Sequence, residues 1–328
     1  MTSHKQQLLE DMDKTMAERS TYMGWKLDYT QPPGEPAYIG PDSVTWRIYK
    51  NPISRVIGGV CAVLLEFADP RIRSGVWDHS TYRRDPVGRS ERTGHAAMIG
   101  AYGPASAARK IIGGVNRMHA RVEGVTPDGQ HYKALDQELL DWVAATAGYG
   151  FLVAYHRFVS PLSDQEIRQF FSESTEIAKL YGVKTKPASL EDFHQMMAKL
   201  EPGFEAHPIN EEFLQVLQNS AKERKIPGFL LHAIVCAAVD IVPKSVSERL
   251  GLNDKYKLSR SGRLLVKGVA RLSERIPKPD STAGQSCERL GLPRTFLWMS
   301  KRKQAALLEE LQASGRLKSW ESYSNDAS

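Results

Sequence analysis

Cysteine is scarce in this chain of 328 residues, which has only Cys61, Cys236 and Cys287. Three widely spaced cysteines exclude a disulfide framework and a cysteine-rich metal site. No Cys-x-x-Cys-His motif occurs, which excludes covalent attachment of a c-type haem. Because Cys61 and Cys236 lie inside apolar runs, we expect both to be buried in the core.

Long hydrophobic runs are also missing. The longest two are Val56–Phe67 and Gly228–Val242, and the second contains His232 and Asp240. Both are shorter than the roughly 20 residues that a membrane-spanning helix needs. The first residues are polar and lack the apolar core of a signal peptide. We therefore expect buried core helices, no membrane span and a cytoplasmic location.

The charge pattern and the absence of several known catalytic motifs exclude several function classes. The net charge is +6, but basic residues are spread along the chain among acidic ones. No lysine- and arginine-rich run with interleaved aromatics and no zinc-finger spacing occurs, so we expect no nucleic-acid partner. The chain has no Gly-x-Ser-x-Gly elbow, no P-loop and no His-Glu-x-x-His motif. Gly58 and Gly59 lie inside an apolar helix, where close packing explains them better than phosphate binding.

Helix signals dominate the rest of the sequence and predict an all-α fold, with about ten helices in the core and at most one small hairpin near Val125–Ala134. We expect an N-terminal helix and loop over 1–39, a main domain over 40–275, and a C-terminal helix and polar tail over 276–328. An ordered loop is expected over 78–88. The expected helices cover residues 8–19, 52–68, 89–101, 105–122, 136–158, 163–182, 189–200, 211–224, 227–241, 245–250, 259–275 and 300–313.

His119 is the first candidate for a functional residue. It lies late in an expected helix, where Val115, Met118 and Val122 flank it and place it at the edge of an apolar stripe. A neutral imidazole on an apolar wall is a suitable axial ligand for haem iron. The alternative is a buried structural histidine that is hydrogen-bonded to a backbone carbonyl.

Arg89, Arg92 and Thr93 form a second candidate group. Their spacing allows all three side chains to face one side of a helix start, where free N–H groups and the helix dipole also attract anions. Haem propionates, phosphate or a substrate carboxylate would fit there. The alternative is that these arginines lie on the surface and pair with Glu91 and Asp85.

Three further residues are candidates for which the sequence allows several roles. His79 lies in the expected loop, where it can orient an arginine, act as an acid or base, or form hydrogen bonds that shape the loop. Arg117 and Arg121 flank His119 and can either reach propionates or remain in solvent. Trp46 and Arg47, by contrast, are expected to anchor the N-terminal segment to the core by packing.

Six segments in this order resemble the domain shared by latex clearing protein (rubber oxygenase) and the MpaB-type oxygenases, long catalogued as a domain of unknown function. The resemblance runs from about residue 40 to residue 275 and is strongest between 40 and 160. The segments are Gly40-Pro-Asp-Ser-Val-Thr-Trp-Arg47, Glu66-Phe-Ala-Asp-Pro70, Gly75-Val-Trp-Asp-His-Ser80, Arg84-Asp-Pro-Val-Gly-Arg-Ser-Glu-Arg-Thr93, Met118-His-Ala-Arg-Val-Glu-Gly124 and Tyr132-Lys-Ala-Leu-Asp-Gln-Glu-Leu-Leu-Asp-Trp-Val143.

The resemblance implies a globin-like, mostly helical core that binds haem b, with His119 as the proximal iron ligand. It also places Arg89, Arg92 and Thr93 in the family's motif beside the haem pocket. For latex clearing protein the implied activity is dioxygen-dependent cleavage of an isoprenoid carbon–carbon double bond. For the MpaB relatives it is oxidative cleavage of a terpenoid chain.

The chain departs from the family pattern at four positions. Asp69 and Ala144 stand where the family usually has histidine, Asn116 stands where many members have arginine, and Gln137 stands where many have proline. The loss of two histidines removes polar groups that line the pocket, and it bears on the reaction more than on the fold. Glu66 is a nearby carboxylate, but nothing in the motifs aligns it with the catalytic base of the rubber enzymes.

These observations favour a haem b-dependent oxygenase that uses dioxygen on a small or medium apolar substrate, either terpenoid or aromatic. Two alternatives remain open. One is a haem enzyme with another outcome, such as a peroxidase, a hydroxylase or a biosynthetic oxidase, because fold does not fix function. The other is a non-catalytic helical binding protein that has lost the metal.

Overall fold

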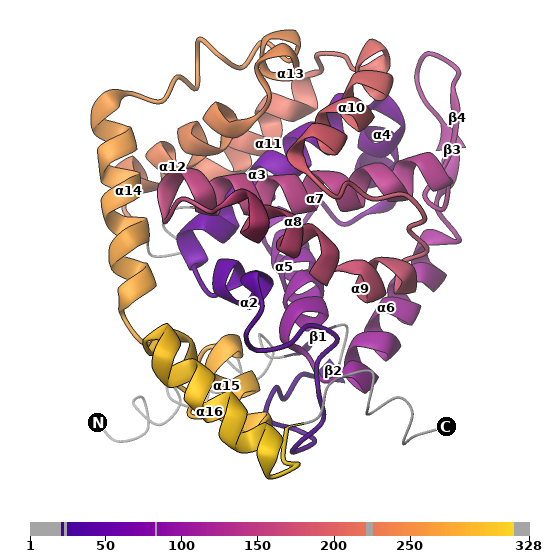
Figure 1. Cartoon of the computed structure of the whole chain (residues 1–328). Helices are drawn as coiled ribbons and strands as arrows, with labels where there is room; N and C mark the ends of the chain where they lie inside the picture. The colour runs from indigo at the N-terminus through magenta and orange to yellow at the C-terminus, as the bar shows by residue number, and fades with distance from the viewer. Residues whose placement is uncertain (1–20, 23–24, 83, 221–225, 318–328) are drawn as a thin grey trace, which may run out of the picture.

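The computed structural model describes residues 21–22, 25–82, 84–220 and 226–317, and this part of the chain is mostly helical (Figure 1). The all-α fold that the sequence predicts is therefore confirmed. The helix expected over 8–19 lies outside the described residues. Within the described part, no helix combines the length and the apolar character needed to cross a bilayer.

The helices follow one another with short connections. They are α2 (Val44–Tyr49), α3 (Pro52–Ala68), α4 (Pro70–His79), α5 (Pro86–Tyr102), α6 (Ala105–His119), α7 (Gln137–Phe158), α8 (Asp164–Glu173), α9 (Thr175–Leu180), α10 (Leu190–Leu200), α11 (Pro208–Asn219), α12 (Gly228–Ile241), α13 (Lys244–Arg249), α14 (Arg260–Arg275), α15 (Thr282–Arg289) and α16 (Lys301–Ala313), with 3₁₀ turns at Glu201–Gly203 and Phe296–Trp298. The strands are β1 (Thr21–Tyr22), β2 (Trp25–Lys26), β3 (Glu123–Val125) and β4 (His131–Lys133). Two antiparallel hairpins result, and in the second Gly124 pairs with Tyr132, as expected for that region.

Helices α3 and α7 form the central pair, which other helices surround (Figure 1). They meet where two glycines face each other. A Cβ atom added to Gly58 would lie 2.7 Å from the carbonyl oxygen of Gly150, and one added to Gly150 would overlap the carbonyl oxygen of Gly58. The two backbones can approach this closely only because both positions lack a side chain. The packing role expected for Gly58 is thus confirmed.

The prediction of a loop over residues 78–88 is wrong at both ends of the segment. At the start of the expected loop, residues 78 and 79 belong to α4, which extends to His79. Asp69 caps the beginning of α4 by accepting a hydrogen bond from the Arg71 backbone N–H at 2.9 Å. At the end of the expected loop, α5 already begins at Pro86, and Asp85 caps it by accepting from the Gly88 N–H at 2.9 Å. Aspartate followed by proline is therefore a helix start here rather than a free turn.

Other boundaries differ by about one turn. The helix expected to reach residue 122 ends at His119, and the one expected over 163–182 is divided at Ser174 into α8 and α9. The capping box that opens α8 at Ser163 is present. Helices α2, α4 and α15 and the first hairpin were not expected from the sequence.

Buried side chains form two clusters. The larger surrounds α3, α7 and α12, and the smaller joins the N-terminal loop and the C-terminal helices to α5 and α6. Trp46 is fully buried in the smaller cluster, where its Nε1 donates to the Ala101 carbonyl at 2.9 Å and its own carbonyl accepts from the Tyr102 hydroxyl at 2.7 Å. The packing role expected for Trp46 is confirmed, as is the burial of the cysteines.

A single arginine ties the two ends of the described chain together. Arg289 of α15 is 2% exposed, and its guanidinium donates to the carbonyls of Tyr29, Glu35 and Tyr102 at 2.7–2.8 Å. Helices α15 and α16 therefore close the lower end of the molecule in Figure 1, beside the N-terminal hairpin.

Candidate functional site

His119 is the last residue of α6 and is partly buried. Its Nδ1 atom is inaccessible to solvent and has no hydrogen-bond partner among the described residues. Burial, and then the positive charge of Arg89, lower the pKa of His119, so the imidazole is neutral at pH 7. Buried polar atoms are almost always hydrogen-bonded, so an unpartnered nitrogen on a neutral ring is what a metal-ligating histidine offers.

One turn earlier on α6, Asn116 also has an unsatisfied buried atom. Its Nδ2 donates to the Leu180 carbonyl at 2.7 Å, while its Oδ1 has no partner. Residues three apart share a helix face, so Asn116 and His119 present two unpaired polar atoms on the same side of α6.

Glu66 approaches this region from α3. Thr146 of α7 donates its hydroxyl to the Glu66 carboxylate at 3.3 Å. Burial raises the pKa of Glu66 to about 7, against smaller lowering effects from the Arg89 charge and the Thr146 hydrogen bond. A carboxyl group that titrates near neutral pH is suited to general acid–base chemistry.

Arg89 connects these groups. Its charge acts on the pKa values of both Glu66 and His119, so the first turns of α5 lie near α3 and the end of α6. Its guanidinium also contacts the Thr93 hydroxyl, which in turn donates to the Arg89 carbonyl at 3.1 Å. Four helices, α3, α5, α6 and α7, thus bring one carboxyl group, one arginine and one histidine to a common region.

The face of α3 that carries Glu66 is less buried than the rest of the helix. From Ile57 to Ala68, only Gly59, Val63 and Glu66 are not fully buried, and they recur at the spacing of one helix face. A Cβ atom on Gly59 would meet nothing closer than a Phe151 ring carbon at 4.0 Å. This partly exposed, mostly apolar strip, the open face of α3, is the side of the helix on which a ligand would meet Glu66.

The structure places the other predicted residues elsewhere. Arg92 pairs with Asp85 at 3.1 Å and contacts the Thr81 hydroxyl, which is the surface pairing considered as its alternative role. His79 is exposed, and its Nε2 lies 3.2 Å from the hydroxyl of Tyr132 in the β3–β4 hairpin. Arg117 and Arg121 are both exposed on either side of His119.

Two members of the site were not singled out from the sequence. Glu66 was noted only as a nearby carboxylate, although a charged residue inside the apolar run of α3 is itself a signal for a special environment. Thr146 gave no signal, because it is 80 residues from Glu66 in the sequence and no local pattern links the two. Within the described residues, no three histidine, cysteine, aspartate or glutamate side chains are grouped as a metal site, so His119 is a candidate for a single protein ligand.

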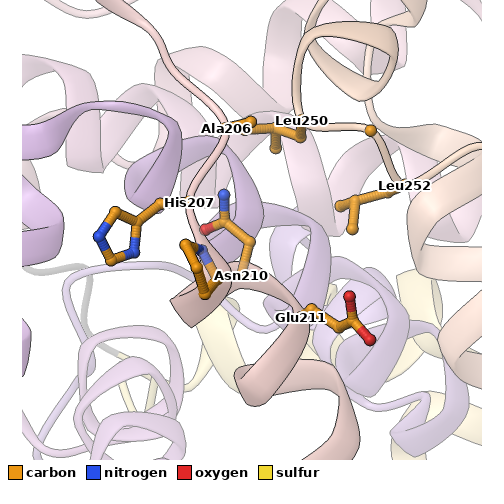
Figure 2. Close-up of a pocket in the computed structure, with 8 residues that line it drawn as sticks. Ala206, His207, Asn210, Glu211, Leu250 and Leu252 are labelled. Carbon is orange, nitrogen blue, oxygen red and sulfur yellow. The ribbon is translucent and has the colours of Figure 1, made fainter.

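A separate surface hollow of about 240 Å³ lies at the start of α11. Figure 2 shows Asn210 beside His207, with Leu250 and Leu252 on the other side. Asn210 is 1% exposed and both of its amide atoms lack partners, while His207 caps α11 by accepting from the Ile209 N–H at 3.2 Å. This hollow shares no residue with the group around His119.

One comparison with known proteins gives a match. A family model described as ER-bound oxygenase mpaB/B'/Rubber oxygenase, catalytic domain, covers residues 46–274. No curated protein and no solved structure matches the chain. The matched segment contains α3, α5, α6 and α7, and with them Glu66, Arg89 and His119.

Proposed function

This chain belongs to the family of ER-bound mpaB-type oxygenase and rubber oxygenase catalytic domains, and we propose that it is a haem b-dependent oxygenase. The proposed co-substrates are dioxygen and a small or medium apolar molecule, either terpenoid or aromatic. The observation that carries this proposal is the buried, unpartnered Nδ1 of a neutral His119 beside an open apolar helix face.

The residues present fit a haem. His119 would hold the iron, since a neutral imidazole is the usual proximal ligand. A Cβ at Gly94 of α5 would meet no atom within 4 Å, and one at Gly59 of α3 only a ring carbon of Phe151 at 4.0 Å, so neither position would obstruct a bound ligand. Arg89 would neutralise a propionate or a substrate carboxylate. Bound haem would supply the activation of dioxygen, which no side chain provides.

The chain's own residues then have distinct tasks. The apolar face around Val63 would bind the substrate and exclude water. Glu66, with a pKa of about 7, would hold or release a proton at its carboxylate oxygens at neutral pH. Arg89 lies close enough to stabilise the ionised form of Glu66, and Thr146 orients the carboxylate.

A haem enzyme with another outcome, such as a peroxidase, a hydroxylase or a biosynthetic oxidase, is the second candidate. Asp69, at one family histidine position, caps α4 and pairs with Arg71 at 2.6 Å, so it is occupied in a structural role. At the other position, Ala144 has no polar group. Neither position therefore offers the proton donor or acceptor that the family's histidines provide.

The first test is the absorption spectrum of the purified protein before and after dithionite, together with a pyridine haemochrome assay. A b-type haem signal supports the proposal, and dioxygen consumption with terpenoid and aromatic candidates then separates the two outcomes. Absence of haem even after reconstitution with hemin would contradict haem-dependent catalysis and favour a binding protein that has lost the metal.

His119→Ala tests the ligand itself, with the exposed His131→Ala as the matched control. We expect His119→Ala to lose most of its haem because the axial bond is removed, while His131→Ala retains it. Full occupancy with an unchanged spectrum in His119→Ala would refute the assignment of the ligand.

A further inference from the structure

Arg55, near the start of α3, carries a positive charge that no carboxylate offsets. Its Nε atom is inaccessible to solvent and has no hydrogen-bond partner, and its Nη1 faces the sulfur of Met98. No aspartate or glutamate of the described chain forms an ion pair with it. By contrast, the buried Arg73 pairs with Glu205, and Arg289 donates to three carbonyls. A buried polar atom without a hydrogen bond is costly, so the Nε atom of Arg55 lacks a partner that its environment requires.

The groups around Arg55 include a buried phenol and a second cation. Tyr29 is 6% exposed and its hydroxyl is also buried without a partner. Burial raises the pKa of Tyr29, and the charges of Arg289 and then of Arg55 lower it. Arg55 is therefore close enough to Tyr29 for its charge to act on the phenol. Lys278 is a second cation close enough for Arg55 to lower its pKa, after the larger effect of burial.

The Glu274 carboxylate, whose charge acts on Lys278, already has other partners. Glu274 pairs with Lys50 at 3.0 Å and accepts from the Tyr155 hydroxyl at 3.0 Å and from Asn51 at 3.1 Å. The charges near Arg55 therefore leave a net positive site with at least one unpaired neutral donor.

Arg55 lies on the same open face of α3 as the candidate catalytic region. It precedes Gly59 by four residues and Glu66 by eleven, and all three positions are partly accessible. Eleven residues of α-helix correspond to about 16 Å along the axis. The open face thus has at one end Glu66, which the charge of Arg89 reaches as it reaches His119, and at the other the guanidinium of Arg55.

We propose that Arg55, together with the Tyr29 hydroxyl, binds the carboxylate of a ligand that lies along the open face of α3. A guanidinium and a phenol provide several N–H and O–H donors that match the oxygens of a carboxylate. The inference rests on the proposed function, in which two ligands carry such a group: the haem, through a propionate, and an apolar substrate that is an acid.

The first experiment distinguishes the haem from the substrate. Hemin and hemin dimethyl ester, in which both propionates are esterified, are titrated into the haem-free protein and followed by absorbance. If Arg55 binds a propionate, Arg55→Met should weaken hemin binding by about 10-fold or more and leave the affinity for the ester unchanged. Arg263→Met is the control, because Arg263 pairs with Asp240 on α12 at 2.7 Å instead.

The second experiment tests the substrate source. Geranic acid and geraniol share an apolar chain but differ in the carboxylate, and calorimetry measures the binding of each to haem-free and haem-loaded protein. If Arg55 binds a substrate carboxylate, the wild type should prefer the acid, and Arg55→Met should lose that preference while it binds hemin normally.

The outcomes separate this inference from the proposed function. Wild-type affinities of Arg55→Met for all four compounds would overturn the carboxylate site, whether or not the protein binds haem. A preference for the acid that Arg55→Met loses would support the site even if hemin never binds and the haem proposal fails. If Arg55→Met does not fold, as judged by circular dichroism, Tyr29→Phe replaces it, and an unchanged discrimination in that variant would also overturn the site.

Discussion

Replacement of Glu66 by glutamine should stabilise the protein at alkaline pH and have little effect at acidic pH. Glutamine keeps the shape of the side chain and an oxygen for the Thr146 hydroxyl, but it cannot ionise. In the folded protein, burial raises the pKa of Glu66 from 4.5 to about 7, against the lowering effects of Arg89 and Thr146. The folded state therefore binds the proton more tightly than the unfolded chain does.

The sign and the size of the effect follow from this difference. A raised pKa contributes stability that is fully present below pH 4.5, decreases as the pH rises, and is lost above about pH 7. The difference between the two pKa values corresponds to about 3 kcal/mol. Because the side chain retains some exposure, we expect about 2 kcal/mol in practice.

Urea unfolding at pH 4.5 and pH 8 measures the free energy of unfolding of Glu66→Gln and of the wild type. The exposed Glu191→Gln on α10 is the matched control and should not change the pH dependence. An equal stability difference at both pH values would refute a buried carboxyl group with a raised pKa. A loss of stability at pH 8 would show instead that the ionised form is the one that Arg89 stabilises.

Three further changes test other parts of the structure. Gly150→Ala should destabilise by about 1–3 kcal/mol or more, because its Cβ overlaps the Gly58 carbonyl; thermal unfolding checks this against Gly148→Ala, whose Cβ makes only ordinary contacts. Arg289→Met should lower the free energy of unfolding by about 3 kcal/mol or more, since three buried carbonyls lose their donor; an unchanged urea midpoint would contradict this. For Glu166, burial raises the pKa, but bonds from Ser163 and Arg47 outweigh it and hold the pKa at about 2. Its stabilisation is present above pH 4.5 and lost as the pH falls, so Glu166→Gln should destabilise at pH 7 and not at pH 2.

Local signals predicted much of the fold. Pro52 and the apolar run that follows it give both ends of α3, and Ser163 with Glu166 opens α8 by a capping box. These signals act over one helical turn, so a single sequence displays them completely. The same rule explains the error at residues 78–88, where Asp85 and the following proline satisfy both a turn and a helix start.

The candidate site was predicted less completely, because its members meet through the packing of helices. Glu66 and Arg89 are 23 residues apart, and Arg89 and His119 are 30 apart. No local pattern states which face of α3 turns toward α5 and α6. The motif resemblance identified Arg89 and His119, but Arg55 and Thr146 become visible only when burial and hydrogen-bond partners are known.

The hydrogen bonds of Arg289 bear on where the chain can be truncated without loss of stability. The segment that matches the family model ends at residue 274, yet the smaller buried cluster takes Cys287, Phe296 and Leu311 from beyond that point. A protein truncated there would lose these members of the cluster and leave the carbonyls of Tyr29 and Glu35 without their donor. We therefore expect the matched segment, expressed without the C-terminal helices, to be less stable to urea than the full chain.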